Sequence, residues 1–264
     1  MSHVGRSMIT VLALSLTLCP VAGGTGEASD SSGDASSLKK RLEGSDPLAA
    51  IQAAEEIRDR GKAEEALVRA LAGAIKHPNE MVRLSVVGAL SEIGADAAPA
   101  VPALTEALED KDPLVREAAA LALFSVGDQS KPAIPGLIAC LGDRSRPVRD
   151  AAILAVVKIG KASVPPLVEA LSREDERTRL GAAEALSRMG EPVVGALIEV
   201  LKEGDSVAAP AASEALVKIG EPAVKPLIHL VLRGNEEAAK LAGDALSEIG
   251  APAVPALVES LKEK

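Results

Sequence analysis

Residues 101–127 read VPALTEALEDKDPLVREAAALALFSVG, and this stretch holds the signals that decide the fold. Asp112 is a residue type that caps helix N-termini, because its carboxylate accepts hydrogen bonds from the unpaired amides of the first turn. Pro113 suits the first helical position, and Gly127 suits the position that follows a helix end, where glycine is expected to adopt the left-handed helical conformation. The stretch therefore predicts a helix of about fourteen residues between Asp112 and Gly127.

The same signals recur along the chain. Gly127 belongs to a row spaced by 33 residues and then by 30: Gly61, Gly94, Gly127, Gly160, Gly190, Gly220 and Gly250. A residue type favoured at N-caps lies fifteen positions before each of these glycines: Asp46, Asn79, Asp112, Ser145, Asp175, Asp205 and Asn235. Such self-similarity is the signature of a repeat protein. We predict seven units in register, each opening with a helix, called here the first helix, that ends at the glycine.

Apolar residues lie eight and four positions before every glycine, as Ala119 and Leu123 do before Gly127. This spacing places them in one stripe on the helix, and the recurring alanines let backbones approach closely. A second helix is expected after each glycine, marked by leucine pairs such as Leu104 and Leu108 or Leu257 and Leu261. The change from 33 to 30 residues falls before the second helix, so the early units are expected to have a longer interhelical loop.

Composition supports an all-helical core and argues against nucleic acid as a partner. Hydrophobic residues make up 47% of the 264-residue chain, which has one phenylalanine and neither tryptophan nor tyrosine. Closely packed helices rich in alanine and leucine suit this composition. The net charge of -9 disfavours phosphate binding, which depends on clustered lysine and arginine.

The N-terminal residues predict export. Arg6 precedes an apolar run at residues 8–18, and Val21-Ala22-Gly23 offers small residues for cleavage, so residues 1–23 form an expected signal peptide. Residues 24–37 are rich in Gly, Ser and acidic types and predict a disordered linker. The solenoid is expected over residues 38–264, with residues 38–43 as a capping half-repeat. No later stretch is expected to reach the length of a transmembrane helix.

Two other interpretations of the N-terminus stay open. Cys19 could anchor a lipoprotein, although Leu18 stands where that signal prefers a small residue. Alternatively, the segment stays uncleaved and the protein remains in the cytoplasm. Cleavage after Gly23 would leave Cys140 as a single cysteine, so no intramolecular disulfide is expected.

Residues 101–123 and 115–141 resemble HEAT repeats, in particular the short type also found in phycobilin lyases. The resemblance extends over residues 38–264. It implies a right-handed α-solenoid of seven antiparallel helix pairs with an N-terminal capping half-repeat, in which the second helices line the concave side. It says little about function, because one repeat architecture supports many roles.

Two columns of charged residues are candidates for function. Arg83, Arg116, Arg149 and Arg179 share one position on the first helices. They could bind a ligand, but we favour a structural role in which each bonds the N-cap Asp or a carbonyl of a neighbouring repeat. One position on the second helices faces away from the leucine stripe and carries Glu106, Ala139, Glu169, Glu199, His229 and Glu259.

The acidic column has a functional and a structural interpretation. Glu106, Glu169, Glu199, His229 and Glu259 could capture a basic segment of a partner along the concave face. The simpler interpretation is a solvated helix face, with Glu169 paired to Arg173 at i+4. For His229 a solvated side chain is favoured over a pH sensor or metal ligand, and for Cys140 a buried small residue is favoured over a reactive thiol.

Sequence motifs for catalysis are missing. The chain has no HExxH, CxxC or GxSxG motif, no phosphate loop and no His-Glu dipeptide of the type that binds iron in one HEAT-repeat enzyme family. We therefore expect a monomeric, noncatalytic scaffold without cofactor or metal that binds a protein or peptide, and a basic segment of that partner is a candidate for the contact. The alternatives are a lyase-like chaperone or enzyme acting on a bound cofactor or modified protein, and a structural envelope or assembly component.

Overall fold

The computed structural model describes residues 31–60, 64–203 and 205–262, and all regular structure in these residues is helical. The chain divides into two compact units, Met1–Asp34 and Ala35–Lys264, and the second unit is the solenoid. The predicted all-α solenoid class is confirmed. The first helices are α2 (Pro47–Asp59), α4 (Glu80–Ile93), α6 (Pro113–Val126), α8 (Arg146–Ile159), α10 (Glu176–Met189), α12 (Ala208–Ile219) and α14 (Glu236–Ile249).

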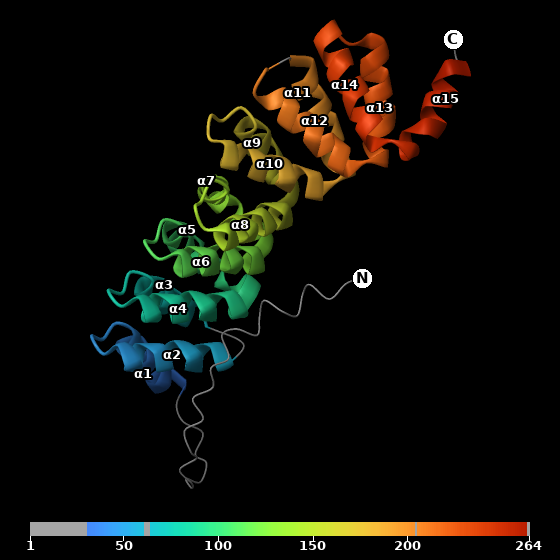
Figure 1. Cartoon of the computed structure of the whole chain (residues 1–264). Coiled ribbons are helices and arrows are strands. Elements are labelled where there is room, and N and C mark those ends of the chain that lie inside the picture. Colours follow the sequence, from blue (N-terminus) through green and yellow to red (C-terminus); the bar gives the residue numbers. More distant parts are fainter. Residues whose placement is uncertain (1–30, 61–63, 204, 263–264) are drawn as a thin grey trace. The chain divides into compact units, whose positions relative to one another are not determined.

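A second helix follows each of these first helices. The second helices are α3 (Glu65–Ala74), α5 (Val101–Ala107), α7 (Ile134–Cys140), α9 (Val164–Ala170), α11 (Val194–Glu203), α13 (Glu221–Arg233) and α15 (Val254–Lys262). First helices pack against the next first helices, as α4, α6 and α8 do side by side in Figure 1. Each second helix from α3 to α13 also packs against the first helix that follows it. Contacts therefore connect each repeat to its neighbours in sequence, as in a solenoid.

Most of the predicted N-caps form. The side chains of Asp46, Asn79, Asp112, Asp175 and Asn235 each accept a hydrogen bond from a backbone amide of the first turn that follows. Ser145 occupies the N-cap position of α8 but makes no such bond with its side chain, so that part of the prediction is wrong.

The start of α12 also differs from the prediction. Asp205 accepts hydrogen bonds from the amides of Val207 and Ala208, yet the helix begins at Ala208 rather than at Ser206. The Ala209 amide donates to the Asp205 carbonyl at 2.8 Å, but Pro210 has no amide hydrogen to donate to the Ser206 carbonyl, so a helix that began at Ser206 would lack its second hydrogen bond. Pro210 is tolerated within the first turn of a helix that begins at Ala208.

The glycines at the ends of the first helices have positive φ, as predicted. Gly127 has φ 72° and ψ -130°, and the glycines from Gly94 to Gly250 in this row have φ between 70° and 78°. The expected left-handed helical conformation is wrong in ψ, because these values correspond to the mirror image of extended backbone, which glycine alone adopts readily. Gly61 lies outside the described residues.

Short 3-10 helices connect the first and second helices. They are η3 (Gly94–Ala100), η4 (Gly127–Ala133), η5 (Gly160–Ser163), η6 (Glu191–Val193) and η7 (Ala251–Ala253). The predicted longer connection of the early repeats is therefore present, and it is a seven-residue 3-10 helix rather than an irregular loop.

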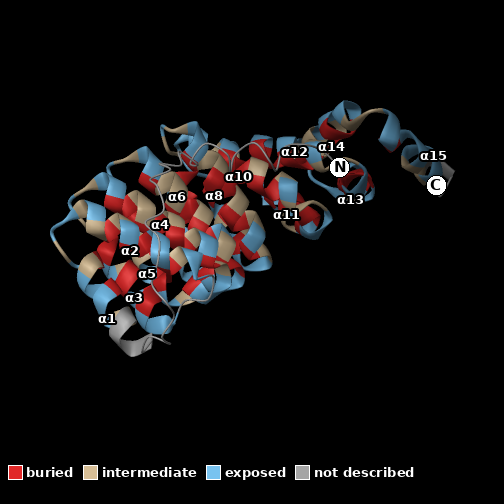
Figure 2. Ribbon diagram, turned by 90° about the horizontal axis from the view of Figure 1, so that it is seen from below, coloured by how far each residue is buried: buried red, intermediate tan, exposed pale blue. Residues whose placement is uncertain are grey.

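The core consists of the apolar rows predicted from the glycine register. The residues eight and four positions before each glycine, such as Ala119 and Leu123, are buried in every repeat. Figure 2 shows buried positions interleaved with exposed ones along the first helices. Leu257 is an exception among the predicted core leucines, since it is 37% exposed whereas Leu227 at the same position is fully buried. Its helix α15 contacts α13 and η7.

Helix α1 (Ser31–Leu42), which begins the described part of the chain, corrects one predicted boundary. Leu38 and Leu42 are buried, as expected for a capping half-repeat, and Ala35 packs against the same core. These residues share one helix face, which explains why the helix extends into the expected linker 24–37. The prediction of disorder is wrong for residues 31–37. Residues 1–30, with the expected signal peptide and Cys19, lie outside the described residues.

Two helical stretches, Glu80–Ala107 and Arg146–Ala170, are long and apolar enough to cross a membrane by length and composition. The expectation that no stretch reaches this length is therefore wrong. Each stretch combines a first helix, a 3-10 helix and a second helix, and Gly94 or Gly160 interrupts it at positive φ. Their apolar character comes from residues such as Val86 and Leu104, which are buried in the core of the solenoid.

Candidate functional site: an acidic column and an arginine ladder

The predicted acidic column lies on the second helices and is interrupted at α7, where Ala139 takes the position. Glu106 is on α5, Glu169 on α9, Glu199 on α11, His229 on α13 and Glu259 on α15, and all five side chains are exposed. The helices α7, α9, α11, α13 and α15 contact one another in this order, so the column runs from repeat to repeat. It lies away from the core leucines Leu104, Leu167, Leu197 and Leu227, which are buried on the same helices.

Some of these glutamates are already paired within the chain. Glu106 forms an ion pair with Lys76 at 2.7 Å, and Glu199 forms one with Lys202 at 2.8 Å. All four side chains are exposed. The expected pair between Glu169 and Arg173 does not form. Arg173 lies beyond the end of α9, in a turn where its amide donates to Ala170 three residues earlier, so it is not at a helical i+4 position.

A groove near the C-terminal end of the solenoid extends the column. It has a volume of about 670 Å³, and Glu191, Glu221, Lys225 and Glu259 contribute to its lining. Sequence analysis identified Glu259 but missed Glu191 and Glu221. Both directly follow a glycine of the repeat row, Gly190 and Gly220, and this shared position could have revealed them. Three carboxylates against one ammonium group make the groove acidic.

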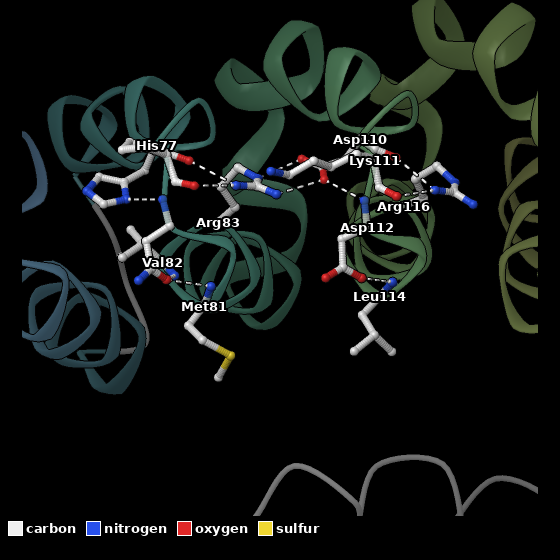
Figure 3. A network of polar contacts seen from close by, with 11 residues as sticks. His77, Met81, Val82, Arg83, Asp110, Lys111, Asp112, Leu114 and Arg116 are labelled. Atoms are coloured by element: carbon white, nitrogen blue, oxygen red, sulfur yellow. Dashed lines mark hydrogen bonds and ion pairs between the residues drawn. The ribbon is translucent and has the colours of Figure 1, made fainter.

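The arginine column forms a ladder along the loops that precede the first helices (Figure 3). The Nε and Nη2 atoms of Arg83 donate to the two carboxylate oxygens of Asp110 at 2.7 and 2.9 Å, and its Nη1 donates to the carbonyls of His77 and Pro78. Arg116 repeats this arrangement with Asp143. Each pair joins one repeat to the next, and the Arg83 side chain is only 6% exposed.

The ladder confirms a structural role and the expected bonds to carbonyls of the preceding repeat, but the carboxylate partner is not the expected N-cap Asp. The carboxylate belongs to Asp110, two residues before the N-cap Asp112. It also accepts a hydrogen bond from the backbone amide of Asp112. Burial acts to raise the pKa of Asp110, but the hydrogen bonds from Arg83 and the Asp112 amide outweigh it, so the pKa is lowered. The bond to Asp110 raises the pKa of Arg83.

The other two arginines of the column make the hydrogen bonds to backbone carbonyls but not those to an aspartate. Arg149 Nη1 donates to the carbonyls of Asp143 and Arg144 at 2.7 and 3.2 Å, and Arg179 Nη1 donates to those of Arg173 and Glu174 at 2.8 and 2.9 Å. Within the described part of the chain, no carboxylate lies within ion-pair distance of either guanidinium.

Comparison with known protein families decides the identity of the fold. The HEAT-repeat family matches residues 35–123, 98–157 and 134–216, which together extend over more than half of the chain. This chain is a HEAT-repeat protein. A search of curated proteins gives no match.

Solved structures resemble this HEAT-repeat protein at low sequence identity. The complex of CpcE and CpcF of phycocyanin lyase from Nostoc sp. PCC7120 is 24% identical, with a TM-score of 0.46 over 92% of this chain and 97% of that one. The HEAT-like repeats protein from Thermococcus onnurineus NA1 is 16% identical, with a TM-score of 0.44 over 83% and 98%. A designed armadillo repeat protein in complex with the peptide (KR)4 is 18% identical, with a TM-score of 0.43 over 81% and 98%.

The remaining candidate residues of this HEAT-repeat protein have structural or solvated positions. Cys140 is buried, its Sγ donates to the Leu108 carbonyl at 3.7 Å, and burial raises its pKa to about 11. The thiol is therefore protonated and unreactive at neutral pH. His77 lies in a loop, where its Nδ1 accepts the Asn79 amide at 3.0 Å. His229 is exposed, and within the described residues no cluster of His, Cys, Asp and Glu could hold a metal ion.

Proposed function

We propose that this HEAT-repeat protein is a noncatalytic scaffold that binds a partner polypeptide through a basic segment laid along the second helices. The observation that carries the proposal is the row of exposed carboxylates Glu169, Glu199 and Glu259, interrupted by His229 on α13, on helices that contact one another. The negative electrostatic potential of such a row attracts lysine and arginine side chains, and a groove strengthens that potential.

The end of the column with the groove is the best place for the first contact. Glu259 shares the groove with Glu191 and Glu221, and Glu169 and Glu259 have no ion-pair partner among the described residues. A basic side chain would therefore meet free carboxylates at these positions. By contrast, Lys76 and Lys202 would have to leave Glu106 and Glu199 before these could bind a partner.

The test compares two variants of the chain by affinity capture and by titration with a basic peptide. The first changes Glu106, Glu169, Glu199 and Glu259 to Gln, and the matched control changes four exposed glutamates outside the column, Glu55, Glu80, Glu176 and Glu236. Both variants lose the same charge. We expect only the first to lose the peptide and the captured partner.

Other outcomes would contradict the proposal in distinct ways. Equal loss in both variants would show a response to net charge alone, and unchanged binding in both would exclude the column. Concentration-dependent sedimentation without a captured partner would favour a structural assembly component. Export is part of the proposal, supported by the charged and apolar pattern of residues 6–23, and capture from the exported fraction of cells tests it.

A further inference from the structure

The arginines of the ladder are held in one orientation in four consecutive repeats. In Arg83, Arg116, Arg149 and Arg179 the Nη1 atom donates to the carbonyls five and six residues earlier in the chain. In Arg83 and Arg116 the opposite edge of the guanidinium, formed by Nε and Nη2, binds both oxygens of an aspartate. This edge matches a carboxylate in geometry as well as in charge.

At Arg149 the residue in the place of that aspartate is an arginine. The Arg173 amide donates to the carbonyl three residues earlier, as the amides of Asp110 and Asp143 do, and each of the three residues precedes an N-cap position by two. The backbone of the ladder therefore continues, but a positive side chain replaces the negative one. Arg173 is exposed and has no ion-pair partner among the described residues.

The nearby carboxylates are engaged elsewhere. Both oxygens of Asp143 bind Arg116, Asp150 pairs with Arg146, and Asp175 accepts from the amide and hydroxyl of Thr178. Arg179 has a different environment, because Glu174, Glu176 and Glu214 line the groove beside it. Arg149 is therefore the arginine whose free edge has a positively charged residue at the ladder position of the aspartate.

We propose that Arg149 and Arg173 form a binding site for a carboxylate of another polypeptide, which would take the place that Asp110 and Asp143 occupy in the preceding repeats. The Nε and Nη2 atoms of Arg149 would bind its two oxygens, and Arg173 would add a second positive charge. This site goes beyond the proposed function, because it recognises an acidic group and lies at the start of α8 and in the loop before α10 rather than on the second helices.

The experiment follows the Nε–H signals of the full chain by NMR with arginine labelled by ¹⁵N. The probe is a blocked peptide with two glutamates among glycines, and its control has glutamine in their place. We expect saturable movement of the Arg149 signal with the glutamate peptide, while the signals of Arg83 and Arg116 stay fixed because their edges are filled. A glycine peptide with a free terminal carboxylate shows whether a chain end serves as well as a side chain.

Three variants make the test specific. Arg149→Lys keeps the charge but loses the paired edge, and we expect binding at least about tenfold weaker. Arg173→Asp supplies the missing partner, so it should abolish peptide binding while the melting temperature stays unchanged or rises. Arg179→Lys is the matched control and should bind as the unmodified chain does.

The proposal fails if the glutamine peptide moves the Arg149 signal equally, or if Arg173→Asp binds the glutamate peptide unchanged. It also fails if no carboxylate peptide moves the signal. These outcomes are independent of the acidic column, because none of its residues is altered.

Discussion

The guanidinium of Arg83 and the carboxylate of Asp110, 27 residues apart in the sequence, are joined by two hydrogen bonds of 2.7 and 2.9 Å across a repeat boundary. Their side chains are only 6% and 12% exposed. Removing one member of a buried pair leaves the other charge without its partner, which costs more than the pair itself contributes.

We therefore expect Asp110→Ala to lower the free energy of unfolding by about 2–4 kcal/mol. Denaturant unfolding followed by circular dichroism measures the change. The control is Glu65→Ala, which removes an exposed pair with Arg69 on α3 and should have little effect. An equally small effect of Asp110→Ala would show that the ladder does not stabilise the boundary.

The same carboxylates predict how stability depends on pH. The pKa of Asp110 and that of Asp143 are lowered from the ordinary value of 3.8, because the bonds they accept outweigh burial. Their contribution is therefore complete above about pH 5 and is lost as the pH falls through the lowered values.

Melting temperatures between pH 7 and pH 3 test this expectation. The double variant Asp110→Asn, Asp143→Asn should start less stable and lose less stability on acidification than the unmodified chain. Burial, and to a lesser extent the charge of Asp150, raise the pKa of Glu117, so its effect on stability has the opposite pH dependence. Because Glu117 is present in both proteins, this effect cancels when their melting curves are compared. Parallel curves for the two proteins would contradict the assignment.

The glycine row predicts a substitution that is costly without any steric clash. A Cβ added to Gly127 would meet no atom closer than 3.8 Å, but φ 72° with ψ -130° is strained for every other residue. We expect Gly127→Ala to destabilise the protein by about 1–3 kcal/mol.

Gly88 provides the matched control, because it lies inside α4 and an added Cβ there would meet nothing within 4 Å. Gly88→Ala should therefore stabilise by about 0.5–1 kcal/mol through helix propensity. If thermal melting ranks the two variants in the reverse order, the backbone conformation assigned to Gly127 is wrong.

The buried thiol predicts slow chemical labelling. Because the pKa of Cys140 is raised to about 11, we expect thiol reagents at pH 8 to react with the folded protein far more slowly than with the unfolded one. The measurement is best made on a Cys19→Ser background, so that Cys140 is the sole thiol. Fast reaction of the folded protein would contradict the burial of this side chain.

The sequence predicts the register of this fold well, because the signals at helix ends are local. Asp112 caps the first turn and Gly127 ends the helix whatever the neighbouring repeats do, and both are recognised by residue type. The rows of apolar residues then follow by counting from the glycine, as Ala119 and Leu123 show.

What the sequence did not predict depends on contacts across a repeat boundary. The partner of Arg83 is Asp110 rather than the N-cap, because the reach of the arginine is set by how two loops pack together. The absence of a Glu169–Arg173 pair depends on the last turn of α9, which ends before a helical spacing is reached. Glu191 and Glu221 become candidate site residues only because they line the same groove as Glu259, which the sequence does not show.

Each repeat packs mainly against its neighbours in sequence, with smaller contacts between next-but-one repeats such as α7 with α10 and α11 with α14. This arrangement has a consequence for how the protein unfolds. Because no central core ties all of the helices together, the resistance to unfolding is distributed over a series of boundaries, and each boundary has its own strength. The boundaries that contain Arg83–Asp110 and Arg116–Asp143 are reinforced, and the next one, at Arg149, has no such ion pair. Heat or force would accordingly separate the chain first beyond Arg149, so that the earlier repeats stay folded while the later ones open one after another.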